Sequence, residues 1–431
     1  MIVRISDFAN HVGEEVTIRG WMYNKRGSGK IYFLQLRDGS GLTQGVAEEG
    51  RASAEVMENA EKLTAESSCK VTGKVVKHPK HDDVFELQVT DIEIVHITED
   101  EYPISKKEHG PDFLLDNRHL WLRSSKQWAI QRVRDCVITA VYDYFHGEGF
   151  VKIDTPIFTP NACEGATTLF EIDYFDEGTV YLSQSGQLYL EAAIMSVGRG
   201  FDFGPVFRAE KSKTRKHLIE FWMMDAEAAF VEHEENMNIQ EGMVRFIVER
   251  CMERCAKELV ILERDIEPMK KLSQPFKRLE YTDAIKELQA KGSQIKFGDD
   301  LSTEDESLLT DDSEVPVFVH KWPKSIKPFY MKTDPENPEL VLNNDLLGTE
   351  GSGELIGGSQ REDSYEILKA AIEHEGLKGE EYQWYLDLRK YGSVPHSGFG
   401  LGLERMVRYV TGTQHIRETI PFPRLLNRMK P

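Results

Sequence analysis

The sequence predicts an α+β protein with two domains, a small N-terminal β-barrel and a larger domain that mixes strands and helices. Its 431 residues exceed the length of a typical single domain. The first 100 residues read as short strands separated by turns that contain Gly or Asp. Beyond them, apolar residues recur at helical spacing in several segments. We therefore expect an N-terminal domain at 1–100, a linker or hinge at 101–125 and the larger domain at 126–431.

Five strand-like runs and one helix make up the expected barrel. The strands are expected near 16–18, 31–36, 42–46, 69–76 and 84–95, and the helix near 52–64. This order fits a five-stranded OB-fold barrel, an architecture that commonly binds single-stranded nucleic acid. Strand alternation puts Leu34 and Leu36 on one face and Phe33 on the other, where its ring could stack on a base. The alternative is that Phe33 belongs to the core, because Ile31 shares its face.

The larger domain should contain at least three helices. An apolar stripe from Gln127 to Phe145 predicts the first, and a strand at 150–153 then leads to Pro156. A second apolar stripe, at 243–251, predicts a helix that packs against a sheet. Residues 365–385 are helical in pattern, and 398–412 read as a glycine-rich strand that enters a helix. Residues 299–314 hold eight acidic and no basic side chains, which predicts a solvated insertion or a mobile flap.

Composition bounds the possible partners. There are 53 Lys and Arg against 73 Asp and Glu, a formal net charge of −20, so any nucleic-acid site must be a local patch. The five cysteines form no CxxC pair, so we expect no zinc site, and their odd number argues against a disulfide framework. The N-terminus lacks an apolar signal core, and no run approaches the ~20 apolar residues of a membrane span. We expect a cytoplasmic protein without a membrane partner.

The stretch from Phe203 to Phe221 carries the densest charge chemistry. It reads as two strands joined by a basic loop, with Arg208 and Glu210 on one face because they are two residues apart. The loop contains Lys211, Lys213, Arg215, Lys216 and His217. Such a cationic tip suits a polyanion such as a nucleoside triphosphate, because guanidinium groups make charge-assisted contacts with phosphate. The alternative is a hairpin whose charges only face water.

Three segments occur in the order of a known family pattern. They are the helix and strand that end at Pro156, the Arg208/Glu210 hairpin, and the string GLGLER at 400–405. Together they resemble motifs 1, 2 and 3 of the class II aminoacyl-tRNA synthetases. Within that class the chain resembles the aspartyl, asparaginyl and lysyl subgroup, and most closely its asparaginyl members. The strings that carry this closer resemblance are HLWLRS (119–124), YLSQSGQLYLEA (181–192), FRAEKSKTRKHLIEFW (207–222), YGSVPHSGFGLGLER (391–405) and IPFPRLLNR (420–428).

The resemblance implies an OB-fold anticodon-binding domain followed by a catalytic domain built on an antiparallel β-sheet flanked by helices. It also implies a two-step reaction, in which L-asparagine attacks ATP to give an adenylate and the acyl group then passes to tRNA(Asn). The substrate itself is the nucleophile, so the protein has to orient the reactants and neutralise charge.

The resemblance gives roles to residues of the ATP site. Arg208 would bridge the α-phosphate and the substrate carboxylate, and Arg405 would hold the triphosphate and lie across the adenine. Phe221 would stack on the other adenine face, with Glu210 and His217 completing the site, so that Arg208, Glu210 and Arg405 are the catalytic candidates. Gly400 and Gly402 would allow close approach. Asp345 and Glu354 would hold Mg²⁺; the alternative for Asp345 is a turn residue in the run 343–345.

The amino-acid pocket would consist of Glu164 and Gln187 near the α-ammonium group, and of Arg361 and Asp225 near the side chain. Aspartyl enzymes carry a lysine where this chain has Leu190, which favours asparagine over aspartate. One departure tempers this, because asparaginyl enzymes usually have glutamate where this chain has Asp225.

The remaining implications concern partners and alternatives. Phe33 and Gln44 match the positions that stack on and hydrogen-bond the central anticodon uridine, and residues 127–156 match a homodimer interface. An aspartyl-tRNA synthetase, discriminating or not, is the same-class alternative. A non-catalytic tRNA-binding paralogue and a tRNA-independent amide-forming ligase are the alternatives from other classes.

Overall fold

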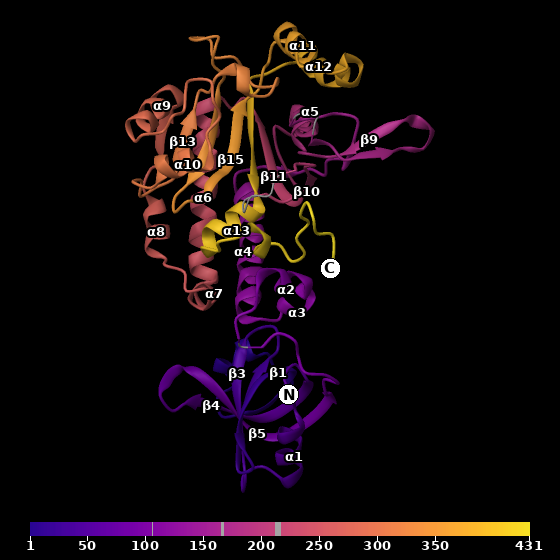
Figure 1. The fold of residues 1–431 in the computed structure, drawn as a ribbon, viewed down its shortest axis with the longest axis vertical. Helices are drawn as coiled ribbons and strands as arrows, with labels where there is room; N and C mark the ends of the chain where they lie inside the picture. The colour runs from indigo at the N-terminus through magenta and orange to yellow at the C-terminus, as the bar shows by residue number, and fades with distance from the viewer. Residues whose placement is uncertain (106, 165–167, 212–216) are drawn as a thin grey trace. The chain divides into compact units, whose positions relative to one another are not determined.

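The computed structural model describes residues 1–105, 107–164, 168–211 and 217–431, and it divides into two compact units, Met1–Gly110 and Pro111–Pro431 (Figure 1). Residues 111–121, which we expected to be part of a linker, form α2 (Pro111–Asp116) and α3 (Arg118–Trp121) and group with the larger unit. The domain boundaries given above stay a prediction. Three of the expected basic loop residues, Lys213, Arg215 and Lys216, lie outside the described residues.

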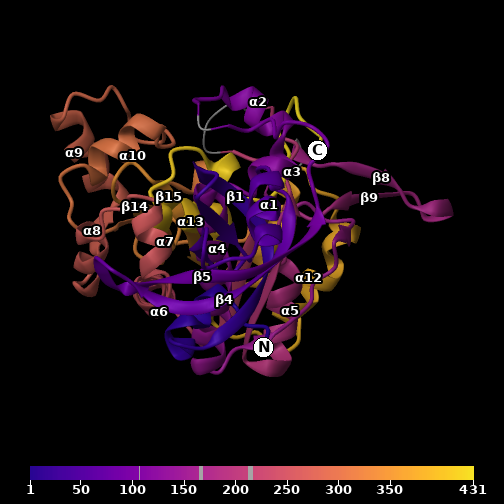
Figure 2. The same cartoon turned by 90° about the horizontal axis from the view of Figure 1, so that it is seen from below.

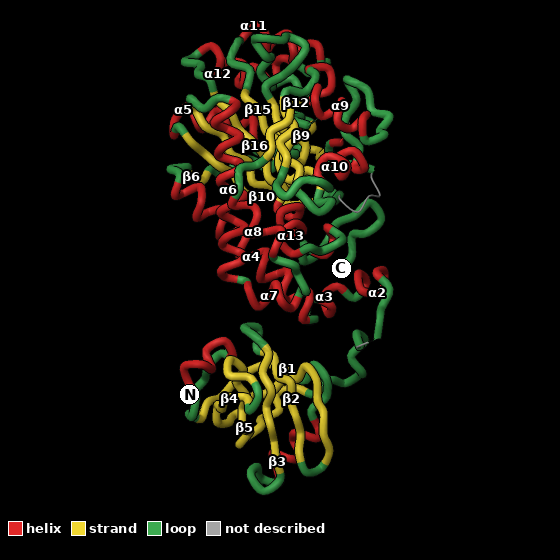
Figure 3. The backbone as a smooth tube through the Cα atoms, turned by 90° about the vertical axis from the view of Figure 1, so that its left-hand side faces the viewer, coloured by secondary structure: helices red, strands yellow, loops and turns green. Residues whose placement is uncertain are grey.

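The smaller unit is a closed five-stranded barrel, as predicted (Figure 3). Its strands are β1 (Glu15–Ser28), β2 (Ile31–Arg37), β3 (Leu42–Glu48), β4 (Ser68–His78) and β5 (His81–His96), in the order β1-β2-β3-β5-β4. The barrel closes because β1 also pairs with β4 and because β3 pairs with β5 in parallel. The short 3₁₀ helix η1 (Ile5–His11) precedes β1. Helix α1 (Ala54–Lys62) follows β3, and the Ser53 hydroxyl caps its N-terminus by accepting from the Val56 amide.

The larger unit is built on an eight-stranded sheet in the order β12-β13-β14-β15-β16-β11-β10-β6. These strands are β12 (Lys277–Glu280), β13 (Val317–His320), β14 (Asn343–Gly348), β15 (Gly353–Gln360), β16 (His396–Gly402), β11 (Glu220–Ala229), β10 (Arg199–Phe207) and β6 (Val151–Lys152). The five central pairs are antiparallel, and only the outermost pair at each edge is parallel. The expected antiparallel sheet is therefore confirmed, with a parallel strand added at both edges.

Three helices cover one face of this sheet: α4 (Ser125–Gly147), α6 (His233–Arg254) and α13 (Leu403–Thr411). Val137, Ile247 and Met406 from these helices are buried in one cluster with Met224 and Leu401 from the sheet. The helices predicted at 127–145, at 243–251 and after the glycine-rich strand are thus confirmed. Since this face is filled, the functional side chains of the sheet have to lie on the opposite face.

Smaller elements surround the sheet. The helices are α5 (Gln187–Val197), α7 (Ala256–Ile261), α8 (Glu267–Lys270), α9 (Tyr281–Ala290), α10 (Thr303–Thr310), α11 (Tyr365–His374) and α12 (Gln383–Lys390). The 3₁₀ helices are η3 (Phe175–Glu177), η4 (Lys271–Ser273), η5 (Lys324–Ile326), η6 (Gly379–Tyr382) and η7 (Ile416–Glu418). A three-stranded sheet of β7 (Phe158–Thr159), β9 (Thr179–Leu182) and β8 (Glu171–Asp173) projects from the larger unit (Figure 2).

The acidic segment 299–314 is not the solvated insertion or mobile flap that its composition predicts. It forms α10, whose N-terminus has a capping box between Ser302 and Asp305. Leu309 is buried in a cluster with Tyr281 and Leu288 of α9. The prediction was wrong because burial of Leu309, together with the cap, packs the middle of the segment, 303–310, as a helix.

None of the helices in the described part of the chain combines the length and the apolar character that a bilayer crossing requires.

Candidate active site

A cavity of about 650 Å³ lies on the face of the large sheet that the three helices leave open. All thirteen candidate residues from the larger unit line it: Glu164, Gln187, Arg208, Glu210, His217, Phe221, Asp225, Asp345, Glu354, Arg361, Gly400, Gly402 and Arg405. They come from segments up to 241 residues apart in the chain (405 − 164), so the fold brings every one of these predicted positions into a single site.

Strand alternation explains why these side chains meet. On β11, Met224 and Ala226 are buried in the helix-covered core, whereas Asp225 and Glu227 point to the opposite face. On the neighbouring strand, Leu401 packs into the core and Gly400 lines the cavity. A Cβ added to Gly400 would lie 2.8 Å from Asp225 Oδ1 and 3.2 Å from Met223 Sδ. Glycine at 400 is therefore needed for the neighbouring carboxylate to reach the cavity.

The hairpin predicted at 203–221 is confirmed, since β10 and β11 pair in antiparallel register up to Phe207 and Glu220. Arg208 and Glu210 lie just beyond the end of β10 rather than within it, and both still line the cavity. The Arg208 guanidinium lies 5.5 Å from the centre of the Phe221 ring. Burial lowers the pKa of Arg208, but Glu164, Glu210 and Glu354 outweigh burial and raise it, so the guanidinium stays charged inside an acidic surrounding.

His217 lies at the mouth of this hairpin, with Nε2 3.9 Å from Glu210 Oε2. Burial and the nearby Arg405 lower its pKa below the ordinary value for histidine. The imidazole is therefore neutral at physiological pH and can accept or donate a hydrogen bond without adding charge.

Two carboxylates face each other across β14 and β15. Asp345 Oδ2 accepts from Lys327 Nζ at 2.7 Å, and Glu354 Oε2 lies 3.2 Å from Arg405 Nη1. A Cβ added to Gly357 would lie 3.2 Å from Glu354 Oε1 and 3.8 Å from Asp345 Oδ1, so both carboxylates flank this glycine. Asp345 lies within β14 and is not a turn residue. Burial raises its pKa to about 6, although Lys327 opposes the shift.

This pair fits Mg²⁺, which proteins hold through one or two carboxylates while substrate phosphates and water complete the shell. The described residues contain no group of three or more His, Cys, Asp or Glu side chains arranged for a metal. Two carboxylates on adjacent strands, open to the cavity, are thus a partial shell of the kind that a nucleotide completes.

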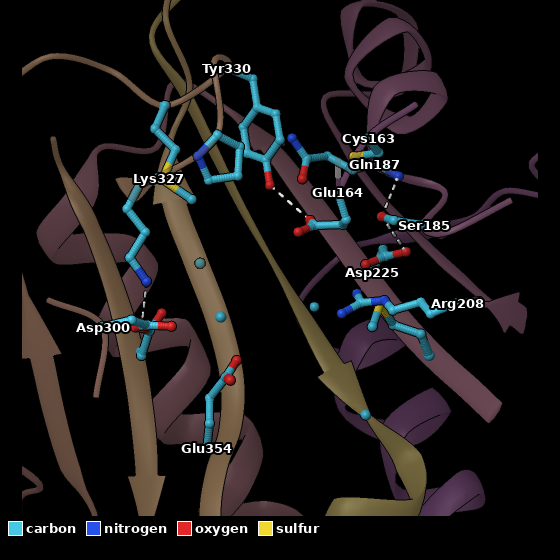
Figure 4. Close-up of a pocket in the computed structure, with 18 of the residues that line it drawn as sticks. Cys163, Glu164, Ser185, Gln187, Arg208, Asp225, Asp300, Lys327, Tyr330 and Glu354 are labelled. Carbon is cyan, nitrogen blue, oxygen red and sulfur yellow. Dashed lines mark hydrogen bonds and ion pairs between the residues drawn. The ribbon is translucent and has the colours of Figure 1, made fainter. Parts of the chain in front are cut away.

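The opposite end of the cavity carries hydrogen-bonding groups suited to a small zwitterion. The Tyr330 hydroxyl donates to Glu164 Oε1 at 2.9 Å, and Asp225 Oδ2 accepts from the Ser185 hydroxyl at 3.0 Å and the Gly186 amide at 2.8 Å. Figure 4 shows Lys327 and Glu354 on one side of the cavity and Arg208 and Asp225 on the other.

Arg361 forms a buried ion pair with Glu227. Its Nε donates to Glu227 Oε1 at 3.1 Å and to Oε2 at 3.2 Å, its Nη2 also donates to Oε1, and its Nη1 donates to Ser359 Oγ at 2.7 Å. The guanidinium lies 5.2 Å from the centre of the Tyr330 ring. Glu227 neutralises Arg361, so the pair carries no net charge while the guanidinium still has N–H groups to offer.

The ionised form of Asp225 destabilises the folded protein, because its carboxylate is buried. Burial raises its pKa to about 6, against donation from Gly186 and Ser185, whereas the ordinary value is 3.8. A raised folded-state pKa means that the stability present below pH 4 is lost as the pH rises through about 6. Asp225→Asn keeps an oxygen for both donors and should therefore raise the melting temperature.

The gain in melting temperature from Asp225→Asn should grow between pH 4 and pH 6 and stay constant above that. Thermal unfolding of both proteins at pH 5, 6 and 8 measures it. A gain that is equal at all three pH values would contradict the assignment of the effect to the Asp225 charge.

The motif resemblance assigned no role to several residues that line or contact the site. They are Glu227, Asp300, Glu306, Lys327 and Tyr330. The only local signal was the two-residue spacing of Asp225 and Glu227, which puts both on one face of a strand. Leu190, offered as a mark of asparagine specificity, is fully buried and does not line the cavity.

In the barrel, Phe33 lies on the outer face of β2, as alternation predicts. Tyr32, Leu34 and Leu36 belong to the core, and Phe33 is only half-buried. Gln44 also lies on the outer face, on β3, where its Nε2 donates to Glu86 Oε1 at 2.6 Å. Phe33 and Gln44 therefore share one surface of the barrel, on which Gln35 of β2 is paired with Gln44 of β3.

Comparisons with known proteins agree with this architecture. Residues 110–426 match the family model of class II tRNA synthetases (D, K and N), and residues 16–95 match an OB-fold nucleic acid binding domain. The chain is 53% identical to the asparagine–tRNA ligase of Pelotomaculum thermopropionicum, over 100% of this chain and 99% of the relative.

Solved structures give the same result. An asparaginyl-tRNA synthetase of Pyrococcus horikoshii complexed with asparaginyl-adenylate superposes with a TM-score of 0.94 at 42% identity, over 98% of this chain and 97% of that one. An aspartyl-tRNA synthetase of Entamoeba histolytica gives a TM-score of 0.83 at 28% identity, over 100% of this chain and 93% of that one. The predicted resemblance is confirmed, and the chain belongs to the family of class II tRNA synthetases that comprises the aspartyl, lysyl and asparaginyl enzymes.

Proposed function

We propose that this protein attaches L-asparagine to tRNA(Asn) in two steps, through an asparaginyl-adenylate formed from ATP. The observation that carries the proposal is a single cavity with two different ends. One end holds arginine and lysine side chains together with the carboxylates Asp345 and Glu354, and the other holds the neutral Arg361–Glu227 pair. The first end suits a triphosphate, and the second suits an uncharged polar side chain. Similarity to the P. horikoshii enzyme bound to asparaginyl-adenylate supports the same product here.

The reaction needs orientation and charge neutralisation more than a protein nucleophile. The asparagine α-carboxylate attacks the α-phosphorus of ATP, and pyrophosphate leaves. Arg208 neutralises the charge that builds on the α-phosphate and holds the attacking carboxylate in line. Arg405 binds the triphosphate, while Phe221, Glu210 and His217 hold the nucleoside.

We assign Mg²⁺ to Asp345 and Glu354. When bound, the ion would neutralise the phosphates of ATP. Lys327, paired with Asp345 in the free protein, supplies a positive charge at the same place, and the pair keeps this buried carboxylate compensated.

The charges around the substrate side chain favour asparagine over aspartate. The substrate amide can accept from the N–H groups of Arg361 and donate to Asp225, both without a change in net charge. Aspartate would bring an additional anion beside Asp225 and Glu227, for which the corner offers only the one guanidinium that Glu227 already neutralises. Glu164 and Gln187 remain for the α-ammonium group.

ATP–pyrophosphate exchange with each amino acid tests the assignment. We expect robust exchange with asparagine and little with aspartate. Exchange with aspartate alone would establish the aspartyl alternative, which the lower identity to the E. histolytica aspartyl enzyme does not favour. A non-catalytic paralogue would show exchange with neither, and an amide-forming ligase would form adenylate without ever charging tRNA.

We assign the outer face of the barrel, around Phe33 and Gln44, to the anticodon of tRNA. Phe33→Ala should leave asparagine-dependent exchange intact and reduce kcat/KM for tRNA charging roughly 5- to 150-fold, because stacking on a base contributes about 1–3 kcal/mol. Steady-state charging assays measure this. Val95→Ala, a loss of another exposed apolar side chain of the barrel, is the control; equal effects of both variants would remove Phe33 from the interface.

We also propose a homodimer formed through residues 127–156, and a cytoplasmic location. The edge strand β6 lies in this region with its outer edge unpaired within the described residues, and Val151 is exposed there. All five cysteines are free thiols, which suits a reducing compartment. Light scattering on the purified chain tests the dimer, and a monomer at micromolar concentration would refute it.

A further inference from the structure

Glu191 is a fully buried carboxylate that does not line the cavity but contacts Gln187, which does. Its side chain is 0% exposed, as is that of Arg389, whose Nη2 donates to Glu191 Oε2 at 2.6 Å. The Tyr385 hydroxyl lies 2.7 Å from Oε1 and 2.8 Å from Oε2, and His396 Nε2 lies 3.0 Å from Oε2. Residues of α12 and β16 thus converge on one carboxylate of α5.

These neighbours keep Glu191 ionised. Burial raises the pKa of Glu191, but the charge of Arg389 and the hydrogen bond from His396 outweigh burial and hold the pKa below its usual range. An ionised carboxylate can only accept hydrogen bonds. Each of its contacts must therefore be a donor.

Gln187 makes the remaining contact to this carboxylate, from one helical turn earlier on α5. Its Nε2 donates to Glu191 Oε1 at 3.2 Å, and its backbone amide donates to Ser185 Oγ at 3.1 Å. Because Glu191 accepts only, the amide of Gln187 must turn its NH₂ group toward Glu191. Its carbonyl oxygen is then free to face the cavity, which Gln187 lines beside Glu164 (Figure 4).

We propose that Glu191 is a positioning residue, which fixes the Gln187 side chain with its carbonyl oxygen toward the cavity as an acceptor for the α-ammonium group of the substrate. The inference rests on the proposed function, in which Gln187 and Glu164 bind that ammonium group. A free amide rotates by half a turn easily and would then present NH₂ hydrogens to a cation. Glu191 removes this alternative, and Arg389, Tyr385 and His396 hold Glu191 in place.

Glu191→Gln tests the inference, since a glutamine has the same shape but can offer either an acceptor or a donor to Gln187. We expect KM for asparagine to rise roughly 10- to 100-fold, the range for a hydrogen bond to a charged group. We expect KM for ATP and kcat to change less than about twofold. Pyrophosphate exchange at saturating ATP and at saturating asparagine separates these constants.

A ligand without the ammonium group distinguishes positioning from pocket shape. Succinamic acid is asparagine that lacks its α-amino group, so it cannot use the oriented oxygen of Gln187. Its inhibition constant should be unchanged in Glu191→Gln while KM for asparagine rises. An equal rise in both constants would overturn the inference, because a general distortion of the pocket affects both ligands.

A double-mutant cycle provides the second test. If Glu191 acts through Gln187, then Gln187→Ala combined with Glu191→Gln should raise KM for asparagine no further than Gln187→Ala alone. Additive effects would overturn the inference. Glu362→Gln is the matched control, because Glu362 is also a buried carboxylate that does not line the cavity, and its backbone oxygen accepts from Arg389 Nε; it should leave KM for asparagine unchanged.

Folding of the variant is checked separately. If Glu191→Gln does not fold, Glu191→Asp keeps the charge and withdraws it from Gln187 by one methylene, and the same KM split between asparagine and succinamic acid is expected. An unmodified protein without asparagine-dependent exchange would refute the proposed function itself. Normal exchange in the unmodified protein, with no KM split in the variants, overturns only the role of Glu191.

Discussion

Arg208→Ala is expected to abolish asparagine-dependent pyrophosphate exchange, with kcat reduced by roughly 10³-fold. Arg208 is a cation among the acidic residues of the cavity, where we place the α-phosphate, and its guanidinium lies beside Phe221, which we assign to the nucleoside. Its Nε is buried and has no hydrogen-bond partner among the described residues, and the side chain lines the cavity. The positive charge of Arg208 stabilises the transition state more than it stabilises the bound substrates. Its loss should therefore lower kcat more than it raises KM.

The fold of the Arg208→Ala variant should survive, and a melting curve close to that of the unmodified protein checks it. Arg199→Ala is the matched control: Arg199 begins β10, the strand that ends one residue before Arg208, lies outside the cavity and pairs with Glu235 at 3.4 Å. Exchange should be normal in this control. Normal exchange in Arg208→Ala would remove Arg208 from the chemistry.

Much of the architecture could be predicted because periodicity is local. The stripe along 127–145 gives a 3.6-residue repeat, and the structure buries its apolar residues in α4. Alternation along 32–36 separates Phe33 from Leu34 and Leu36, and the barrel keeps that separation. Turn residues between the short strands then give the order of a closed barrel.

The acidic segment shows where composition misleads. Its eight carboxylates dominate the average charge and hydropathy of residues 299–314. The helix α10 is nevertheless held by the packing of Leu309 in one cluster with Tyr281 and by the cap at Ser302. The pattern Ser302–Asp305 was a visible helix start, with an acidic residue three positions after a serine. The capping pattern predicts the helix better than the charge does, because a cap hydrogen-bonds backbone N–H groups at the start of a helix. A high negative charge indicates only that the side chains are solvated.

Contacts between distant segments could not be predicted in this way. Arg361 meets Glu227 across 134 residues of chain only because the order of strands brings β15 to β16 and β16 to β11. Lys327 reaches Asp345 on β14 from the loop after η5, a contact that no periodicity in the sequence indicates. The motif resemblance supplied Arg361 and Asp225 but left out Glu227, although Glu227 is the direct partner of Arg361. The neutral corner that favours asparagine therefore became visible only in three dimensions.

Arg361→Met is expected to have the second large effect, because it removes a substrate contact and leaves a buried charge. Glu227 is almost fully buried, and in the free protein its carboxylate depends on Arg361. Breaking a buried pair by removal of one partner typically costs about 3–5 kcal/mol of stability. We expect a lower melting temperature, and kcat/KM for asparagine reduced by roughly 10³-fold through the loss of two or more hydrogen bonds.

The double variant Arg361→Met/Glu227→Leu separates the two effects. Replacing both members of a buried ion pair with apolar side chains is often neutral for stability. The double variant should therefore recover most of the melting temperature and still fail to exchange pyrophosphate with asparagine. Recovery of exchange together with stability would show that Arg361 only neutralises Glu227, and the substrate amide would then need another donor. Persistent inactivity in a stable double variant is the result that ties the guanidinium of Arg361 to the substrate.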